Sequence, residues 1–202
     1  MMPDRRRRRR LRDELDEGLV FFRAFLRRPK QVGSLVPSSR FAERRILELA
    51  RVQEAKLIVE LGAGTGGTTR AILAAMRPEA RLLSVEIDPR LHALLRRIHD
   101  DRLIAHLGSA EDLSEILERH ALGAPEAVIS GIPFSTLGRE RAERVLAAIT
   151  RSLGPGGRFV AYQVTGAVER LCRPFLGEPY EELELLNIPP IRVFRWVRDP
   201  AA

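Results

Sequence analysis

The residues with the clearest chemical potential lie in segment 57–69, which reads LIVELGAGTGGTT. Apolar residues lead into glycines at 62, 64, 66 and 67, which predicts a buried strand that turns sharply into a helix. Glycine permits a tight turn at 62 and lets backbone approach a ligand at 64. A hydroxyl between 65 and 68 is expected to cap the helix. The segment therefore predicts a site for a nucleotide-like ligand.

Two acidic residues narrow the type of ligand. Dinucleotide-binding folds share the strand, glycine turn and helix, but Glu60 at the strand end would repel a pyrophosphate and suits an ammonium group. Glu86 follows Gly64 by 22 residues, the spacing at which an acidic side chain binds ribose hydroxyls. Asp88 competes for that role, although it is better placed to cap a helix that begins at Pro89. We therefore favour a nucleoside that carries a cationic group.

Helices and strands that must position these residues alternate along the chain. Helices are predicted over 40–50, 89–98 and 139–152. Strands are predicted over 57–60, 82–86, 103–107, 127–130, 158–164, 181–186 and 191–197. The alternation is typical of an α/β fold with a mostly parallel sheet, and the last two strands, joined by a proline-rich turn, are expected to form an antiparallel hairpin.

The composition bears on the number of domains and on whether the protein has disulfides, membrane spans or a metal site. A chain of 202 residues suits one domain. The single cysteine, Cys172, forms no internal disulfide and is expected to be a small buried residue in a reducing compartment. No apolar run is long enough to span a bilayer, and the basic start lacks the apolar core of a signal peptide. Two histidines, His92 and His99, have no metal-ligand spacing, so we predict no metal site.

The charge and an apolar stripe at the N-terminus point to a surface. Of the net charge of +7, most comes from residues 1–12, which hold seven arginines and one acidic residue. Leu11, Leu15, Leu19 and Phe22 then recur at helical spacing, with arginines at the stripe's end. Such a helix either packs on the domain or lies in a membrane interface. An arginine tail attracts lipid headgroups and phosphodiesters alike, but the near-neutral remainder disfavours a nucleic-acid partner.

Four segments carry a resemblance to a known family. They read FFRAFLRRPKQVGSLVPSSR, VELGAGTG, SVEID and LLNIPPIRVFRW, in that order. They resemble the bacterial phospholipid N-methyltransferases, class I enzymes that use S-adenosylmethionine and are related to the rRNA adenine dimethylases. The resemblance implies a Rossmann-like fold with strand order 3-2-1-4-5-7-6. It also implies a basic and helical extension over 1–50 and a methyltransferase domain over 51–202.

The resemblance assigns roles to residues of this chain. The expected contacts to S-adenosylmethionine come from Glu60, Gly62, Gly64, Thr65, Gly66, Glu86, Ser109, Ala110 and Ser130. Ser109 departs from the aspartate that many methyltransferases place there to accept the adenine amino group, and Glu111 is a reserve for that contact. The expected substrate loop includes Ser34, Pro37 and Ser38.

A tetrad after the fourth strand is expected to face the substrate. In the adenine dimethylases it reads Asn-Leu-Pro-Tyr, and its asparagine binds the target amino group. Here it reads Gly131, Ile132, Pro133 and Phe134, which disfavours adenine and leaves an aliphatic amine. Phe134, Tyr162 and Asn187 are the predicted catalytic residues, with Tyr162 a candidate to carry away the amine proton.

These observations predict an N-methyltransferase that acts on the headgroup amine of an aminolipid, such as phosphatidylethanolamine and its methylated intermediates. The alternatives are an rRNA or small-molecule N-methyltransferase and a donor-binding protein whose pocket has decayed. We expect a monomer in the cytoplasm, bound peripherally to the inner membrane through the N-terminal helix. Its expected partners are anionic and amine-bearing membrane lipids.

Overall fold

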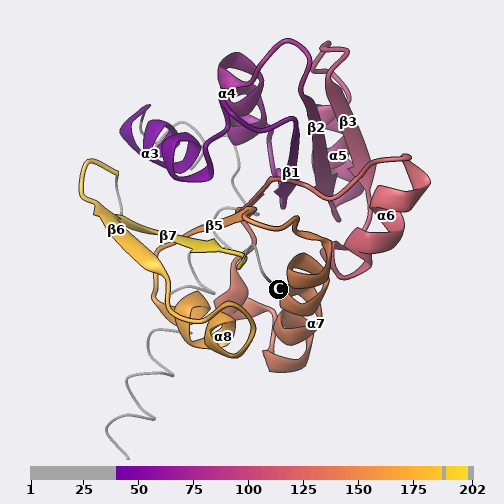
Figure 1. The fold of residues 1–202 in the computed structure, drawn as a ribbon. Helices are drawn as coiled ribbons and strands as arrows, with labels where there is room; N and C mark the ends of the chain where they lie inside the picture. Colours follow the sequence, from indigo (N-terminus) through magenta and orange to yellow (C-terminus); the bar gives the residue numbers. More distant parts are fainter. Residues whose placement is uncertain (1–39, 188–189, 200–202) are drawn as a thin grey trace, which may run out of the picture.

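The computed structural model describes residues 40–187 and 190–199, and its centre is one seven-stranded sheet (Figure 1). The strand order is β3-β2-β1-β4-β5-β7-β6, as predicted. Strands β1 to β5 pair in parallel, and β7 pairs antiparallel with β5 and β6. The strands are β1 (Leu57–Leu61), β2 (Arg81–Glu86), β3 (Leu103–Leu107), β4 (Ala127–Ser130), β5 (Arg158–Gln163), β6 (Tyr180–Glu184) and β7 (Ile191–Val197). The chain therefore has the expected Rossmann-like α/β fold.

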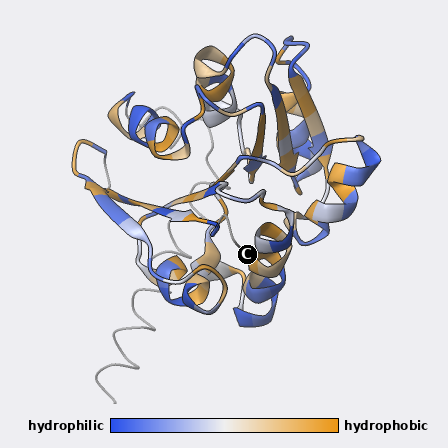
Figure 2. Ribbon diagram, viewed as in Figure 1, coloured by the Kyte–Doolittle hydropathy of each residue, from blue (hydrophilic) through white to orange (hydrophobic). Residues whose placement is uncertain are grey.

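Helices cover both faces of this sheet. α3 and α4 pack on one face and α6, α7 and α8 on the other, so two apolar cores lie on either side of the strands (Figure 1). In Figure 2 the helices alternate between orange and blue, as expected for helices with one buried side. They are α3 (Arg40–Ala50), α4 (Gly67–Ala75), α5 (Pro89–Leu95), α6 (Leu113–Arg119), α7 (Arg139–Ser152) and α8 (Ala167–Leu176), with 3-10 turns η1 (Ala110–Asp112) and η2 (Phe134–Thr136).

The alternation of side chains along β1 sends a carboxylate into the interior. Ile58 joins the core beneath α3 and α4, whereas Val59 and Leu61 join the core on the opposite face. Because side chains alternate with a period of two, Glu60 shares a face with Ile58. The Glu60 side chain therefore lies under α4, where the hydroxyl of Thr69 donates a hydrogen bond to it.

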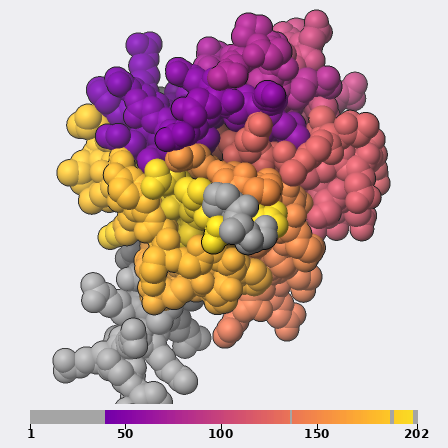
Figure 3. Space-filling model, in the orientation of Figure 1, coloured from indigo at the N-terminus to yellow at the C-terminus, as the bar shows by residue number. Residues whose placement is uncertain are grey.

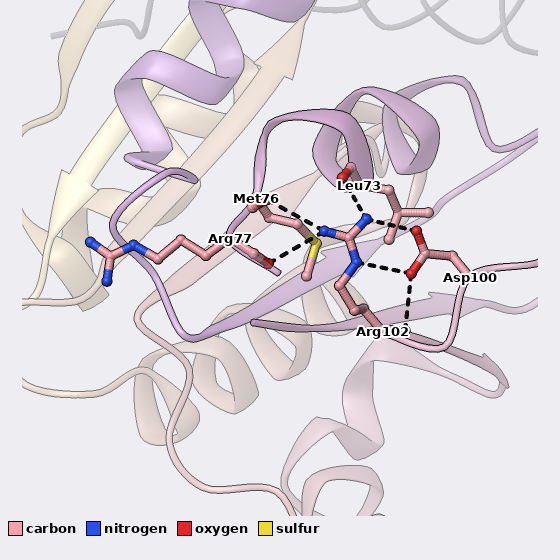
Figure 4. Close-up of polar contacts among 5 residues, drawn as sticks. All are labelled: Leu73, Met76, Arg77, Asp100 and Arg102. Atoms are coloured by element: carbon pink, nitrogen blue, oxygen red, sulfur yellow. Dashed lines mark hydrogen bonds and ion pairs between the residues drawn. The ribbon is translucent and has the colours of Figure 1, made fainter. Parts of the chain in front are cut away.

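A single arginine closes the end of α4 that lies away from the glycine turn (Figure 4). The Arg102 guanidinium donates to the carbonyl oxygens of Leu73 at 2.8 Å, Arg77 at 3.3 Å and Met76 at 3.4 Å. Asp100 holds the same guanidinium through contacts of 2.7 and 2.9 Å. The last carbonyls of a helix have no intrahelical partner, so Arg102 satisfies them and ties α4 to the start of β3.

Most of the predicted elements are confirmed. Helices over 40–50 and 139–152 and strands over 103–107, 127–130 and 191–197 have the predicted bounds. The predicted helix over 89–98 ends earlier, at Leu95, and neither α6 nor α8 was predicted. Cys172 of α8 is fully buried, as expected.

The N-terminal extension is described only in its last part. Residues 1–39, which include the arginine tail and the predicted amphipathic helix, lie outside the described residues. Residues 40–50 form α3, whose Ala42, Ile46 and Leu49 belong to the same core as β1 and β4. No helix in the described part of the chain is long and apolar enough to cross a membrane.

Candidate active site

The candidate site lies at the carboxyl edge of the sheet, where β1 and β4 are neighbours. The chain moves outward from β1 to β2 and β3 and then returns to β4, which makes this the switch point where open α/β sheets bind ligands. The amide of Gly131 donates to the Leu61 carbonyl at 3.0 Å, so the tetrad that follows β4 starts beside the glycine turn that follows β1. A Cβ on Gly62 would lie 3.0 Å from Cγ1 of Ile132. Two predicted parts of the site are therefore in contact.

The glycine turn has the backbone that its sequence predicts. Gly62, Gly64 and Gly66 all have positive φ, at 74°, 59° and 82°. Gly66 is the N-cap residue of α4 and makes no side-chain cap, so the predicted hydroxyl cap is wrong. A left-handed glycine starts this helix instead, and Thr68 and Thr69 are buried. Thr65 is exposed at the turn.

Glu86 is held at this turn by two backbone amides. Its Oε2 accepts from the amide of Gly64 at 2.8 Å and its Oε1 accepts from that of Asp88 at 2.9 Å. The spacing of 22 residues thus corresponds to a direct contact. Asp88 caps α5, as predicted, because its Oδ1 accepts from the amide of Arg90 at 2.7 Å. Each carboxylate oxygen of Glu86 keeps a lone pair for a ligand hydroxyl.

Glu60 is a buried acid with one unused oxygen. Its Oε2 accepts from Oγ1 of Thr69 at 2.6 Å and from Oγ of Ser84 at 2.7 Å. Its Oε1 has no hydrogen-bond partner among the described residues. Burial, opposed by the two hydroxyls and aided by the nearby charge of Glu86, raises the pKa of Glu60 to about 7. A cation at Oε1 would stabilise the ionised form and satisfy the remaining oxygen.

Ser84 and Thr69 are partners of Glu60 that sequence analysis missed. Ser84 interrupts the otherwise apolar run of β2, and the sheet register sets it directly beside Glu60. A polar residue inside a buried strand was the available signal, because buried hydroxyls need partners.

The predicted adenine region follows β3 and is partly engaged by the protein itself. Ser109 is the N-cap of η1, where its Oγ accepts from the amide of Glu111 at 3.2 Å. Ala110 is buried. Glu111 accepts from Arg141 and Arg144 of α7, each at 2.6 Å, and these arginines hold the pKa of Glu111 below its ordinary value. Glu111 therefore fixes η1 to α7, and any contact of Ser109 and Ala110 with adenine stays a prediction.

The tetrad after β4 is shaped by its neighbours. The amide of Ile132 donates to Oγ of Ser130 at 3.2 Å, and Nε2 of Gln163 donates to the Ile132 carbonyl at 2.6 Å. The side chain of Phe134 is 1% exposed and packs in the core, so stacking on a substrate stays a prediction. Gln163 is therefore a positioning residue for the tetrad.

Tyr162 lies at the end of β5, across from this tetrad. Its hydroxyl is 3.2 Å from Oγ1 of Thr68, the residue that follows the first residue of α4. Burial, followed by the charge of Glu60, raises the pKa of Tyr162 to about 12. The hydroxyl is therefore neutral near pH 7 and serves as a hydrogen-bond partner, which argues against its predicted role as the proton acceptor.

Other predicted residues are placed less completely. Asn187, next to the proline-rich turn, is 3% exposed, and its contact with substrate stays a prediction. Ser34, Pro37 and Ser38 lie outside the described residues. Pro133 completes the tetrad and is half-buried.

Comparison with known proteins identifies the chemistry of this edge. Residues 58–157, which run from β1 to the turn before β5, match the family model described as a methyltransferase domain. The chain is an S-adenosylmethionine-dependent class I methyltransferase. The matched segment contains the glycine turn, both buried glutamates and the tetrad that follows β4.

Relatives of this methyltransferase include lipid and RNA enzymes. The ornithine lipid N-methyltransferase of Singulisphaera acidiphila is 29% identical over 174 residues, which cover 85% of this chain and 91% of the relative. The ribosomal RNA small subunit methyltransferase A of Phenylobacterium zucineum is 32% identical over 92 residues, or 46% of this chain and 31% of the relative. The methyltransferase thus spans about a third of that RNA enzyme.

A solved structure shares the fold. The N-methyltransferase NodS from Bradyrhizobium japonicum WM9, in complex with S-adenosyl-L-homocysteine, has a TM-score of 0.60 and 12% identity, over 80% of this chain and 89% of NodS.

The residues at this edge fit the donor that the family uses. The unused Oε1 of Glu60 suits the donor's ammonium group, and the carboxylate of Glu86 suits its ribose hydroxyls. S-adenosylmethionine supplies a methyl group activated by a sulfonium. These contacts remain predictions for the individual residues.

Proposed function

We propose that this methyltransferase acts on the headgroup amine of an aminolipid, such as phosphatidylethanolamine and its methylated intermediates, at a membrane surface. The observation that carries the proposal is the nearly full-length likeness to an ornithine lipid N-methyltransferase, which extends over 91% of that relative. The likeness to RNA methyltransferases reaches only 31% and 34% of two such relatives. The similarity to the lipid enzyme covers 174 residues, so it extends beyond residues 58–157, which match the methyltransferase domain.

The proposed reaction does not require a strong general base from the protein. A lipid amine arrives protonated, and entry into a pocket lined by apolar groups lowers its pKa so that a lone pair becomes free. The chain then has to hold that lone pair in line with the methyl group and to exclude water. Tyr162, with its pKa raised to about 12, stays neutral during this step.

An apolar surface near the site supports action at a membrane. Leu183, Leu185 and Leu186 at the tip of the β6–β7 hairpin are 53%, 67% and 63% exposed. The pairing of Gln163 with Arg192 puts this tip at the same sheet edge as the end of β5. Exposed leucines that cluster beside a site are typical of a surface that contacts another apolar phase.

α3 extends this apolar surface. Phe41 of α3 is 59% exposed, because Ala42 and Ile46 form the buried side of the helix. Arg45 of α3 pairs with Glu182 of β6 at 2.6 Å, and in Figure 3 the atoms of α3 lie directly against the hairpin. A second pair joins Arg192 to Glu181. These pairs neutralise two of the three acidic residues of β6, Glu181 and Glu182, which reduces the repulsion between the hairpin and anionic lipids.

A second candidate function is N-methylation of rRNA, which the identities of 32% and 34% to small subunit rRNA methyltransferases favour. Against it stands Gly131, which lacks the side-chain amide with which the asparagine of the rRNA enzymes would bind a base. The described surface also places exposed leucines at the same sheet edge as the site.

The test is a substrate panel with a labelled methyl donor. Vesicles that contain phosphatidylethanolamine, vesicles that contain an ornithine lipid and purified small-subunit rRNA are offered in parallel, with phosphatidylcholine vesicles as the control. We expect label in one or both aminolipids and none in the control lipid. Label in rRNA alone would replace the proposed function with the second candidate.

A further inference from the structure

The hydroxyl of Tyr162 and the glycine at 131 share one small volume. A Cβ on Gly131 would lie 2.5 Å from the Tyr162 hydroxyl oxygen and 3.1 Å from Cζ of its ring. Real Cβ atoms do not approach another heavy atom so closely, so any larger residue at 131 would displace the hydroxyl. The same Cβ would lie 3.2 Å from the carbonyl oxygen of Gly62 in the donor-binding turn.

Space, and not backbone shape, makes glycine necessary at 131. The described glycines with positive φ are Gly62, Gly64, Gly66, Gly138, Gly156 and Gly177. Gly131 is outside this set, so its backbone would accept an ordinary residue. The Tyr162 hydroxyl is therefore the nearest feature that a side chain at 131 would meet.

The hydroxyl is fixed from several sides. Oγ1 of Thr68 lies 3.2 Å from it, and the Tyr162 ring packs against the core beneath α3 and α4. The next residue, Gln163, binds the Ile132 carbonyl and so holds the tetrad against the end of β5. Tyr162 as a whole residue is half-buried.

We propose, on the basis of the proposed function, that the Tyr162 hydroxyl oxygen accepts a hydrogen bond from an N–H of the lipid amine, and that Gly131 preserves the position of this hydroxyl. Tyr162 can donate its own proton to Oγ1 of Thr68, which leaves its oxygen lone pairs for the amine. An N–H held there turns the nitrogen lone pair away from the tyrosine. Gly131 acts only through Tyr162 and is a positioning residue.

The number of N–H bonds changes with each methyl transfer. In each transfer a nitrogen–carbon bond forms, the carbon–sulfur bond breaks with its electrons on sulfur, and the nitrogen becomes positively charged. After the first and second transfers, the nitrogen releases one proton to water and is neutral again. The reacting primary amine has two N–H bonds, the monomethyl amine has one and the dimethyl amine has none. Tyr162 is therefore useful in the first two transfers and not in the third.

Substitution of Tyr162 by phenylalanine tests this dependence. Phosphatidylethanolamine and its monomethyl and dimethyl derivatives are offered separately in phosphatidylcholine vesicles. We expect kcat/KM of Tyr162→Phe to fall about tenfold for the first two lipids and to stay unchanged for the third. Equal loss on all three lipids, or no loss on any, would overturn the proposal.

Two further measurements separate this role from a structural one and from the proposed function itself. Calorimetric affinity of Tyr162→Phe for S-adenosylhomocysteine is expected to equal that of wild type, and a large loss would assign Tyr162 to donor binding instead. If the wild-type chain methylates none of the three lipids, the proposed function fails, whatever the variant does.

The contact between residue 131 and Tyr162 can also be tested by thermal stability, which does not depend on activity. Gly131→Ala should lower Tm in the wild-type background and lower it less in Tyr162→Phe, because the nearest contact then relaxes from 2.5 Å to 3.1 Å. Gly123→Ala, where a Cβ meets no atom within 4 Å, is the matched control. If Gly131→Ala lowers Tm equally in the wild type and in Tyr162→Phe, the Tyr162 hydroxyl is not the reason that residue 131 must be glycine.

Discussion

At the scale of single residues, the site is organised by two buried glutamates with different hydrogen-bond partners. Glu86 uses both oxygens on backbone amides of the glycine turn and of the start of α5. Within the described part of the chain, Glu60 has two hydroxyl donors on one oxygen and none on the other. A cation at the other oxygen would favour the ionised form of a carboxyl whose pKa burial has raised to about 7, so donor binding and ionisation of Glu60 are coupled.

This coupling predicts that both the stability of the fold and the affinity for the donor depend on pH. The pKa of Glu60 is about 7 in the folded chain, above the ordinary value of 4.5. Between about pH 5 and pH 7 the folded chain thus binds more protons than the unfolded chain, so its stability without donor falls as pH rises. Donor affinity should change the opposite way and strengthen as pH rises through about 7, because the ammonium binds the ionised form. Calorimetric titrations with S-adenosylhomocysteine on both sides of this pH measure it.

Glu60→Gln separates the two effects. The variant should keep its stability as pH rises, because it has no carboxyl to ionise, and should bind donor at least about tenfold more weakly. Glu118→Gln, at an exposed position of α6, is the control and should change neither quantity. Tight donor binding by Glu60→Gln would remove the ammonium assignment.

At the scale of elements, α4 connects the glycine turn to a cap supplied from outside the helix. Its first turn begins at a left-handed glycine, and its last carbonyls accept from Arg102 (Figure 4). The residues that complete its two ends, Gly66 and Arg102, both lie outside the helix. The orientation of the turn toward the donor therefore depends on contacts at both ends of α4.

Loss of the Arg102 cap should lower stability without changing the chemistry. Arg102→Ala removes the guanidinium donor from the carbonyl of Leu73 in the last turn of α4 and from those of Met76 and Arg77 just after it, and should reduce the free energy of unfolding by about 1–3 kcal/mol. Arg97→Ala, an exposed arginine nearby, should have little effect. Urea unfolding of the two variants makes the comparison, and equal stability would contradict the role of Arg102.

The elements and the site were predictable to different degrees. Periodic segments such as β1 and α7 follow from their apolar spacing, and the glycine turn follows from its own composition. α8 escaped prediction because Pro174 lies inside it and reads as a helix breaker. The partnership of Tyr162 with Gly131 could not be predicted, because it depends on how β4 and β5 pair. The two residues are 31 positions apart in the sequence, and the register between β4 and β5 brings them together.

At the scale of the whole molecule, the donor-binding edge of the sheet and the exposed leucines of the β6–β7 hairpin lie at the same end of the strands. Val197, which is 45% exposed, lies at the other end of β7 and pairs with Arg158. The proposed membrane contact would therefore place the site next to the headgroups and leave Val197 away from them.

Charge at the hairpin tip should weaken vesicle binding. Leu185→Asp and Leu186→Asp alter exposed side chains, so folding and donor affinity should be retained while cosedimentation with vesicles falls. Val197→Asp adds the same charge at the opposite edge and should bind vesicles as wild type does. Unchanged binding by the leucine variants would exclude the hairpin from the membrane contact.

The central claim is that this methyltransferase modifies the amine of a membrane lipid, and the lipids of cells that express it test the claim most directly. In a bacterial host whose aminolipids carry no N-methyl groups, mass spectrometry of the lipid extract should show N-methylated headgroups with the wild-type chain and a smaller amount of them with Glu60→Gln, which binds the donor more weakly. A lipid profile that is identical for wild type, Glu60→Gln and an empty vector would contradict the account.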